Sequence, residues 1–451
     1  MSTAAVDFVS SWHVREGCHG IADLLSWIAE RNTSVAVSVD RICLSACSPW
    51  HMDVDSGFIR NPSGSFFQVA GLRSVERDVR GGGERRAEQP IILQREVGFL
   101  GFVLAQIHGV PHLLVQAKIE PGNVNRVQLS PTIQATRSNF MRAHGGEEPA
   151  HLRLFADRSG ARAVVDQLQS EQALRFLGKR NRNVALEVAE PPEEGVAFRW
   201  MTLGQLKRFM REDNLVNMDA RTVISCLPLG LPSDPGERAR AFGLLNDSKM
   251  FHESSRELVP LSSLEGWEVS DAGVERAGAP FRVMYADIAI EGREVARWRQ
   301  PLFEARGRAW FGLAFCWEGG APRFLVRVRR EAGCFDGAEL GPTVQLEAGY
   351  DEDSLEGLDA AFAAAAAGGA DTDVVLSEEG GRFYHEENRN TLVEVASLAD
   401  LPLEEGCIWL SWGTLNEMCQ YFDVCNIQLR NLLALVDGER FIAYLEEASR
   451  G

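Results

Sequence analysis

Two neighbouring stretches in the N-terminal half of the chain alternate strictly between apolar and polar side chains. They are VQAKIE at 115–120, within LLVQAKIE, and VQLSPTIQAT at 127–136. Successive side chains of a β-strand point to opposite faces, so this period predicts two strands that each have one apolar and one polar face. The connecting segment PGNVNR at 121–126 is typical of a turn, and we expect the two strands to pair as an antiparallel hairpin.

The polar face of this hairpin carries mainly amides and hydroxyls, where a solvated face usually carries Lys, Glu and Arg. Its members are Gln116, Lys118, Glu120, Gln128, Ser130, Thr132, Gln134 and Thr136, with Arg137 and Asn139 just beyond. Short neutral groups that both donate and accept hydrogen bonds suit sugar hydroxyls. The pattern therefore predicts a sugar-binding face, while a plain solvated face stays open as the alternative.

The chain also repeats itself at a spacing of about 210 residues, which indicates an internal duplication. LSPTIQ at 129–134 recurs as LGPTVQ at 340–345, and the preceding LLVQAKIEPG recurs as FLVRVRREAG. Further on, NRNVALEV at 181–188 recurs as NRNTLVEV at 388–395, and 199–221 corresponds to 408–430. In this alignment Lys118 lies over Arg329 and Glu120 lies over Glu331.

Each copy is predicted to hold strands first and helices afterwards, which makes the fold class α+β. We expect a curved, mostly antiparallel or mixed sheet flanked by helices, the first of which begins at Thr202 as its N-cap. The predicted organisation is an N-terminal helical lead at 1–40, a first repeat at 41–230, a linker at 231–245 and a second repeat at 246–451.

Composition limits the function classes that fit. The net charge of −18 argues against free nucleic acid as a partner, because nucleic-acid binding calls for concentrated positive charge. Nine cysteines without C-x-x-C spacing predict reduced thiols in a cytoplasmic protein. An uninterrupted apolar run of about 18 residues is missing, so no membrane span is expected.

Outside the hairpin, a few residues are candidates for ligand contacts. Trp50 and His51 lie in a Pro-led loop, Trp267 is the equivalent of Trp50 in the second copy, and Arg182 lies in the segment RNRN. The tryptophans fit either base stacking or core packing, His51 fits either catalysis or a local hydrogen bond, and Arg182 fits either a diphosphate or a turn. Glycine-rich nucleotide motifs and zinc-type Cys/His spacing are missing, so neither a bound cofactor nor a metal is expected.

The hairpin segment 113–140, with SPWHMDVDSGFIRN before it and NLVNMDARTVISCL after it, resembles the NDP-hexose 2,3-dehydratases over essentially the whole chain. The resemblance implies two tandem Nudix-like domains assembled as a homodimer. It also implies action on dTDP-4-keto-6-deoxyglucose in the biosynthesis of 2,6-dideoxy sugars for antibiotics. The acidic Nudix-box pattern is missing, so metal-dependent diphosphate hydrolysis is not implied.

The implied reaction removes the C3 proton beside the C4 carbonyl and expels the C2 hydroxyl as water, which needs a base, an oxyanion stabiliser and an acid. We expect Glu120 to be the base, Lys118 to stabilise the C4 oxyanion and His51 to be the acid. Substrate contacts are expected from Trp50, Gln116, Gln128, Ser130, Thr132, Gln134, Thr136, Arg137, Asn139, Arg182, Trp267, Arg329, Thr343 and Gln345.

The first repeat is expected to be catalytic, because the second has Glu339, Gly341 and Glu347 where the first has Gln128, Ser130 and Thr136. A 3-ketoreductase is the expected partner that consumes the unstable product. Two alternatives stay open at this point: a non-catalytic nucleotide-sugar binding protein, and an epimerase or isomerase that returns a proton to C3 instead of losing water.

Overall fold

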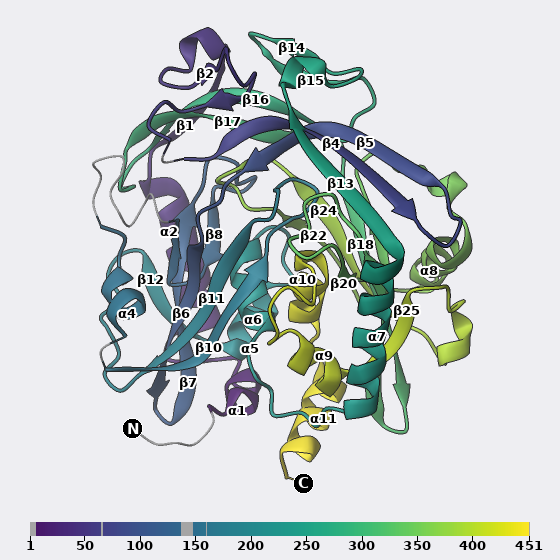
Figure 1. Cartoon of the computed structure of the whole chain (residues 1–451). Helices are drawn as coiled ribbons and strands as arrows, with labels where there is room; N and C mark the ends of the chain where they lie inside the picture. Colours follow the sequence, from purple (N-terminus) through teal and green to yellow (C-terminus); the bar gives the residue numbers. More distant parts are fainter. Residues whose placement is uncertain (1–5, 65, 137–147, 159, 451) are drawn as a thin grey trace.

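A computed structural model describes residues 6–64, 66–136, 148–158 and 160–450. Figure 1 shows two sheets on either side of a column of helices, with long strands arching across one end. The predicted α+β class is confirmed, with both antiparallel and mixed sheets. In the described part of the chain, no helix has both the length and the apolar character needed to cross a membrane.

The sheet formed by the N-terminal half, here called the N-half sheet, has the strand order β10-β11-β6-β7-β12. Strand β8 pairs with β7, and β9 pairs with β6. Strand β11 runs parallel to β6, and the other named pairs are antiparallel. Its strands are β6 (Gly98–Ile107), β7 (Val110–Ile119), β8 (Val127–Ser130), β9 (Ile133–Ala135), β10 (Ala161–Ser170), β11 (Arg180–Val188) and β12 (Phe198–Thr202).

The C-half sheet repeats this arrangement with strands from the C-terminal half. Its order is β22-β24-β18-β19-β25, with β20 on β19 and β21 on β18, and β24 again runs parallel to β18. The corresponding strands of the two sheets therefore have the same neighbours. The strands are β18 (Ala309–Glu318), β19 (Ala321–Arg329), β20 (Glu339–Gly341), β21 (Val344–Leu346), β22 (Thr372–Ser377), β24 (Glu387–Glu394) and β25 (Cys407–Ser411).

Two further sheets arch over this pair, and each takes one strand from the opposite half. In the first, β13 (His252–Val259) pairs with β4 (Gln68–Asp78), next to β2 (His51–Met52), β3 (Ile59–Arg60) and β5 (Glu84–Leu93). In the second, β1 (Val37–Ile42) pairs with β16 (Phe281–Ile290), beside β14 (Glu268–Ser270), β15 (Gly273–Glu275), β17 (Arg297–Ala305) and β23 (Phe383–Tyr384). The two halves are thus joined by reciprocal strand exchange.

Helices at matching places in the two halves begin with the same kind of cap. The predicted N-cap Thr202 is confirmed: its hydroxyl accepts from Gln205 N, and the Gln205 side chain accepts from Thr202 N. The sequence predicts a helix over TLGQLKRFMREDN at 202–214, but helix α5 ends at Phe209. The helices are α1 (Phe8–His13), α2 (Ile21–Ser34), α4 (Leu152–Asp157), α5 (Leu203–Phe209), α6 (Met218–Ser225), α7 (Pro235–Phe251), α8 (Gly357–Gly368), α9 (Trp412–Met418), α10 (Ile427–Leu435) and α11 (Glu439–Arg450), and 3-10 turns lie at Leu44–Ala46, Leu261–Ser263, Glu352–Ser354 and Leu398–Asp400.

The segments at the predicted domain boundaries have defined structure. Helices α1 and α2 lie within the predicted helical lead, and the predicted linker 231–245 contains the first part of α7, which Asp234 caps. Helices α6 and α10 lie between the N-half and C-half sheets in Figure 1. One apolar cluster includes residues from both sheets and from these helices, so the two halves share a core.

Two glycines allow the backbones of the two halves to touch. Gly122 N donates to Gly380 O at 2.7 Å, and Gly333 N donates to Ala173 O at 2.8 Å. A Cβ atom on Gly122 would lie only 1.6 Å from the carbonyl oxygen of Phe383. Since real Cβ contacts are never this short, the close approach requires glycine. This contact places the end of β7 directly against the C-terminal half.

Candidate functional site

The hairpin that alternation predicts is present, and it ends at the candidate site. Strands β7 and β8 are antiparallel, with Gln116 opposite Ser130 and Lys118 opposite Gln128. After Pro131 the chain leaves β7, and β9 pairs with β6 instead, so that Gln134 lies opposite Leu100. The row of polar residues is therefore divided between two neighbouring strands of the N-half sheet.

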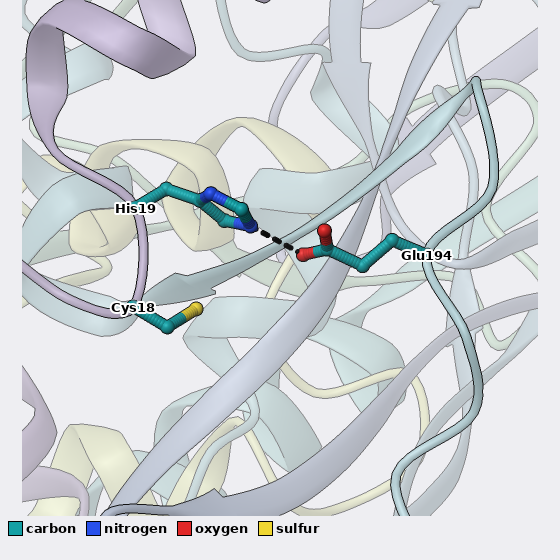
Figure 2. Close-up of side chains that lie close together, drawn as sticks. All are labelled: Cys18, His19 and Glu194. Carbon is teal, nitrogen blue, oxygen red and sulfur yellow. Dashed lines mark hydrogen bonds and ion pairs between the residues drawn. The ribbon is translucent and has the colours of Figure 1, made fainter.

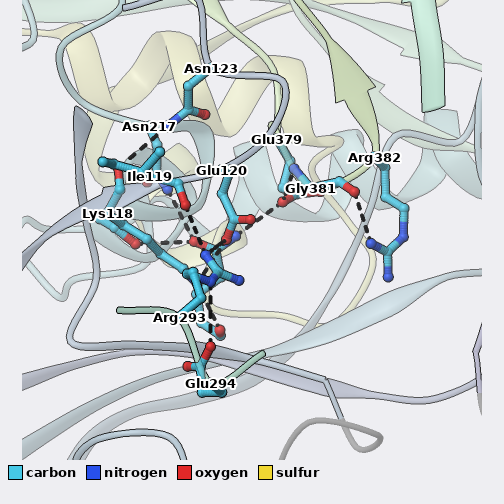
Figure 3. A network of polar contacts seen from close by, with 12 residues as sticks. Lys118, Ile119, Glu120, Asn123, Asn217, Arg293, Glu294, Glu379, Gly381 and Arg382 are labelled. Atoms are coloured by element: carbon cyan, nitrogen blue, oxygen red, sulfur yellow. Dashed lines mark hydrogen bonds and ion pairs between the residues drawn. The ribbon is translucent and has the colours of Figure 1, made fainter. Parts of the chain in front are cut away.

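At the end of β7, Glu120 forms ion pairs with one cation from each half of the chain. Its Oε1 lies 3.0 Å from Lys118 Nζ and 3.0 Å from Arg293 Nη1. Figure 3 shows Glu120 between these cations and the Glu379 side chain. Burial raises the pKa of Glu120, but Arg293 and Lys118 outweigh burial and lower this pKa to about 2. Glu120 is therefore an ionised carboxylate that binds protons weakly.

Outside this ion pair lies a cavity of about 630 Å³, here called the outer cavity. Its walls combine aromatic rings with guanidinium groups, which suits a nucleobase joined to a diphosphate. The aromatic lining residues are Trp50, Phe66, Phe67 and Trp298. The arginines in its walls are Arg293, Arg297, Arg299 and Arg382.

A smaller cavity of about 100 Å³, the inner cavity, lies on the other side of the ion pair. The two cavities share Glu120, Arg293, Gly381 and Arg382 as lining residues, so they meet at Glu120. Titratable groups crowd the inner walls: Lys118, Glu120, Glu171, Lys179, Asp219, Arg293, Glu379 and Arg382. Such a concentration of buried ionisable groups is typical of catalytic sites.

Burial moves the pKa values of Glu171 and Lys179 toward neutral pH. Burial raises the pKa of Glu171 to about 7, and burial lowers the pKa of Lys179 below its ordinary value. One oxygen of Glu171 accepts from Asn181 Nδ2 at 2.6 Å, while Oε1 has no hydrogen-bond partner among the described residues. Glu171 can therefore take up or release a proton without breaking an existing contact.

Asp219 is a second unpartnered carboxyl in the inner cavity. It lies in the first turn of α6 and is 1% exposed, and neither of its oxygens has a hydrogen-bond partner among the described residues. Burial, with the carboxylates of Glu379 and Glu171, raises the pKa of Asp219 well above its ordinary value. The raised pKa favours the protonated form, so this side chain is a candidate proton donor.

Gln134 and Glu379 complete the inner wall and connect the two halves. Lys118 Nζ donates to the Gln134 carbonyl at 3.0 Å, and Gln134 Nε2 donates to Glu379 Oε1 at 3.2 Å. Burial and the nearby Glu120 carboxylate raise the pKa of Glu379. The inner cavity therefore contains carboxyl groups with different proton affinities, the arrangement that separates acid from base roles at one pH.

The corresponding place in the C-terminal half is almost closed. A cavity of about 10 Å³ there is lined by residues including Arg175, Glu347, Glu378, Glu386 and Gln428. Arg175 Nη2 donates to Glu347 Oε2 at 2.6 Å across the space. Gln428 occupies the position that Asp219 holds in the first half, and Glu386 the position of Lys179. This half offers less room and lacks a counterpart of the Asp219 carboxyl.

Five residues expected from the sequence line the cavities: Trp50 lines the outer one, and Lys118, Glu120, Gln134 and Thr136 line the inner one. Three others hold the walls together. Gln128 Nε2 donates to Ser377 Oγ at 2.6 Å, Thr132 donates to the Leu114 carbonyl, and Ser130 Oγ donates to Gln134 Oε1 at 3.1 Å. These polar groups face protein partners.

The remaining expected residues of the first half, together with Trp267, lie away from both cavities or beyond the described residues. His51 and Gln116 do not line either cavity, and the His51 ring contacts the Pro49 carbonyl at 3.2 Å. Arg182 donates to Asp166, and Trp267 donates to the Glu88 carbonyl within an apolar cluster. Arg137 and Asn139 lie outside the residues that the structure describes.

The expected residues of the C-half sheet are occupied by contacts within that half. Arg329 donates to the carbonyl of Thr343 at 3.3 Å, and the Thr343 hydroxyl donates to the carbonyl of Leu325. Gln345 Nε2 donates to Glu331 Oε1 at 2.5 Å. Each of these side chains therefore has a protein partner within its own half.

Several cavity residues are not among those expected from the sequence. For four of them, the internal repeat contains a signal. Extending the repeat upstream of NRN aligns EQALRFLGKRNRN at 171–183 with EEGGRFYHEENRN at 378–390 without a gap. That extension contains Glu171, Lys179, Glu379 and Arg382. Arg293 and Arg299 have no comparable local signal, because they approach the site only through the tertiary fold.

The chain matches the sequence model of one protein family twice. The sequence model of the family described as NDP-hexose 2,3-dehydratase matches residues 21–227 and again residues 239–436. The chain is similar to proteins named dTDP-4-dehydro-6-deoxy-alpha-D-glucopyranose 2,3-dehydratase. One from Streptomyces violaceoruber is 37% identical over 433 residues, which cover 91% of this chain and 96% of that protein.

A second protein of that name, from Saccharopolyspora spinosa, is 36% identical over 449 residues and covers 92% of each chain. A third, from Amycolatopsis orientalis, is 34% identical over 92% of this chain and 90% of its own length. Among solved structures, an ADP compounds hydrolase aligns with 40% of this chain at 16% identity and a TM-score of 0.24, which is too low to establish a common fold. On the family match and these long alignments, the chain belongs to the NDP-hexose 2,3-dehydratase family.

Proposed function

We propose that this chain is a hydro-lyase that removes the C2 hydroxyl of dTDP-4-keto-6-deoxy-D-glucose as water. The product is a 3,4-diketo-2,6-dideoxy sugar nucleotide. The observation that carries the proposal is the pair of joined cavities: the outer one is lined by aromatic rings and arginines, and the inner one is lined by buried acids and lysines. Family membership and the names of the long relatives support the same reaction.

The outer cavity fits the nucleotide part of this substrate. Trp50 and Trp298 offer ring faces for thymine, and Arg293 and Arg382 stand at the junction where a diphosphate leads to the sugar. In this proposal the hexose extends past Glu120 into the inner cavity.

The reaction can be written with its electrons in balance. A base takes the C3 proton, the C3–H pair forms a C3=C4 bond, and the C4 oxygen becomes an oxyanion. When the oxyanion re-forms the C4=O bond, the C3=C4 electron pair forms a C2=C3 bond and the C2–O bond breaks. The departing hydroxide takes a proton from an acid and leaves as water. The remaining C3 enol gains a proton at C2 and loses its hydroxyl proton, which gives the 3,4-diketone.

Within this scheme we assign the oxyanion to Lys118, as the sequence suggests, and we change the base. Glu120 was the expected base, but two cations at 3.0 Å hold its pKa at about 2. A general base works best when its pKa is near the working pH, and Glu171, with a pKa of about 7, meets that condition. Glu120 then serves to hold Lys118 and Arg293 in position.

We assign the acid to Asp219. His51 was expected in this role, but it does not line either cavity. Asp219 faces the inner cavity with both oxygens unpartnered among the described residues, and its raised pKa keeps a proton available. Donation to the leaving hydroxyl would convert it to a carboxylate beside Lys118, whose charge favours that form.

The experiment that tests the function uses the whole chain with dTDP-4-keto-6-deoxyglucose in heavy water, with an NADPH-dependent 3-ketoreductase to trap the product. We expect a sugar that lacks the C2 oxygen and carries deuterium at C2. A non-catalytic binding protein would leave the substrate unchanged. An epimerase or isomerase would return a sugar that keeps its C2 oxygen, and either of these results would overturn the proposal.

Several finer features complete the proposal. We propose two tandem Nudix-like units at 41–230 and 246–451, joined by 231–245; two successive family matches and the repeated strand order support the duplication. In this division β13 of the second unit pairs with β4 of the first, and β1, at the start of the first unit, pairs with β16 of the second. We also propose that the chain forms a homodimer in the cytoplasm, serves antibiotic deoxysugar biosynthesis and passes its unstable product to a 3-ketoreductase, as the family resemblance implies.

A further inference from the structure

A thiol, an imidazole and a carboxylate converge far from the two cavities. Cys18 and His19 lie in the loop between α1 and α2, and Glu194 lies in the segment that precedes β12. One ligand atom from each lies within 4.8 Å of the others, and His19 Nε2 is 2.7 Å from Glu194 Oε1. Figure 2 shows the Cys18 and His19 side chains pointing toward the Glu194 carboxylate from the same stretch of backbone. Within the described ranges, this is the one group of three such side chains close enough to hold a metal ion.

The backbone around these side chains is held by hydrogen bonds from packed neighbours. Trp200 N donates to Glu194 Oε1 at 2.7 Å, and Gln205 Nε2 donates to the His19 carbonyl at 2.7 Å. Cys18 N donates to His112 Nε2 at 3.3 Å. Such outer contacts fix the direction of ligand side chains before a metal arrives.

A divalent cation at this place would bind the Cys18 thiolate and the Glu194 carboxylate directly. Partial exposure of all three side chains leaves space for a water molecule as a further ligand.

We propose that Cys18 Sγ, His19 Nε2 and a Glu194 oxygen bind one zinc-class divalent cation, with water in the fourth position. A sulfur, nitrogen and oxygen donor set is typical of Zn²⁺, which accepts all three in tetrahedral sites. None of the three residues lines the outer or inner cavity, so the site is separate from the proposed reaction.

The structural role of this site follows from the segments that it joins. The cation would fasten the loop between α1 and α2 to the segment before β12, which pairs with β7 in the N-half sheet. Binding would therefore stabilise the folded chain by an amount that grows with the logarithm of the metal concentration above the dissociation constant. Local spacing does not predict this site, since Glu194 is 175 residues from His19.

Cobalt is the probe, because a thiolate bound to Co²⁺ produces a near-ultraviolet charge-transfer band. The full chain, stripped with a chelator and kept reduced, is titrated with Co²⁺ and then with Zn²⁺. We expect one Co²⁺ per chain, the thiolate band, its loss when Zn²⁺ displaces cobalt, and a higher melting temperature with Zn²⁺. Release of a proton on binding is expected as well.

Variants assign the ligands. C18S should lose the near-ultraviolet band, and H19A and E194Q should weaken Co²⁺ binding at least about 10-fold, since even outer-shell changes cost that much. C43S is the matched control, because Cys43 is an exposed free thiol outside the group, and it should leave the spectrum unchanged. Wild-type chain without the thiolate band, or a band that persists in C18S, would overturn the proposal whatever the enzymatic activity of the chain.

Discussion

The carboxylate of Glu120 lies 3.0 Å from the guanidinium of Arg293, and this buried ion pair joins the N-terminal half of the chain to the C-terminal half. Glu120 follows β7, whereas Arg293 follows β16. The outer and inner cavities meet at this pair. The candidate site is therefore built by both halves, although the catalytic groups that we assign come from the first.

Replacing Arg293 with Gln should destabilise the chain by about 3–5 kcal/mol, because it leaves Glu120 buried with one cation fewer. Chemical denaturation measures this loss. The control is Arg41→Gln, which breaks the exposed pair between Arg41 and Glu304 and should cost about 0–1 kcal/mol. Equal losses in the two variants would show that the Glu120–Arg293 pair is not the joint that we describe.

Asp219→Asn should abolish most of the water loss while it preserves substrate binding. Asparagine keeps the size and neutrality of a protonated aspartic acid but cannot donate the proton, so kcat should fall by about 10²- to 10⁴-fold. The dissociation constant for the dTDP-sugar, measured by calorimetry, should change little. Gln428→Asn alters the corresponding position of the nearly closed cavity and should leave kcat near the wild-type value. A D219N variant with full activity would remove Asp219 from the mechanism.

The raised pKa of Glu171 predicts that a rise in pH increases activity and lowers the free energy of unfolding. Its pKa is raised to about 7, so the folded chain holds a proton that the unfolded chain loses near pH 4.5. Between these two pH values the folded state binds more protons than the unfolded state. The free energy of unfolding of the wild type, relative to that of Glu171→Gln, should therefore fall by on the order of 3 kcal/mol as the pH rises. Activity should rise through about pH 7, because the base must be ionised.

The control for this pH prediction is Glu378→Gln, since Glu378 is the counterpart of Glu171 and its pKa is raised to about 8 by burial. The free energy of unfolding of the wild type, relative to that of E378Q, should also fall as the pH rises. The pH–rate profile of E378Q should keep the wild-type shape. If E171Q kept the wild-type rise in activity near pH 7, the base would have to be sought elsewhere.

Local sequence pattern predicted part of the site because that part is local. Alternation placed Lys118 and Glu120 on the same face of one strand, and pairing in register brought Gln128 opposite Lys118. The same pattern could not tell what would cover that face. Gln128 donates a hydrogen bond to Ser377 of the other half, and Thr132 donates one to the Leu114 carbonyl. These two side chains therefore bind protein groups and stabilise the fold.

The rest of the site depends on contacts between distant segments, which a period of two residues does not encode. Arg293 and Glu379 reach Glu120 only because the halves exchange strands and share a core. Asp219 lies in the first turn of α6, where an acidic side chain interacts favourably with the helix dipole, so its place in the sequence does not mark it as functional. Its isolation from partners is visible only once α6 is packed between the sheets.

The contact between the halves at Gly122 gives a test of the fold. A Cβ at this position would meet the Phe383 carbonyl at 1.6 Å, so Gly122→Ala should destabilise the chain by about 3 kcal/mol. Gly243→Ala is the control, because Gly243 lies inside α7 with open space around it and alanine favours a helix by about 1 kcal/mol. The melting temperature should fall for G122A and rise for G243A. A G122A variant with an unchanged melting temperature would rule out the close backbone contact.

The most direct test of the central claim is a crystal structure of the Asp219→Asn variant with dTDP-4-keto-6-deoxyglucose bound. We predict thymine beside Trp50, the diphosphate on Arg293 and Arg382, and the C4 oxygen within hydrogen-bond reach of Lys118. A hexose that lies outside the inner cavity, with its C2 and C4 oxygens away from residue 219 and Lys118, would contradict the account.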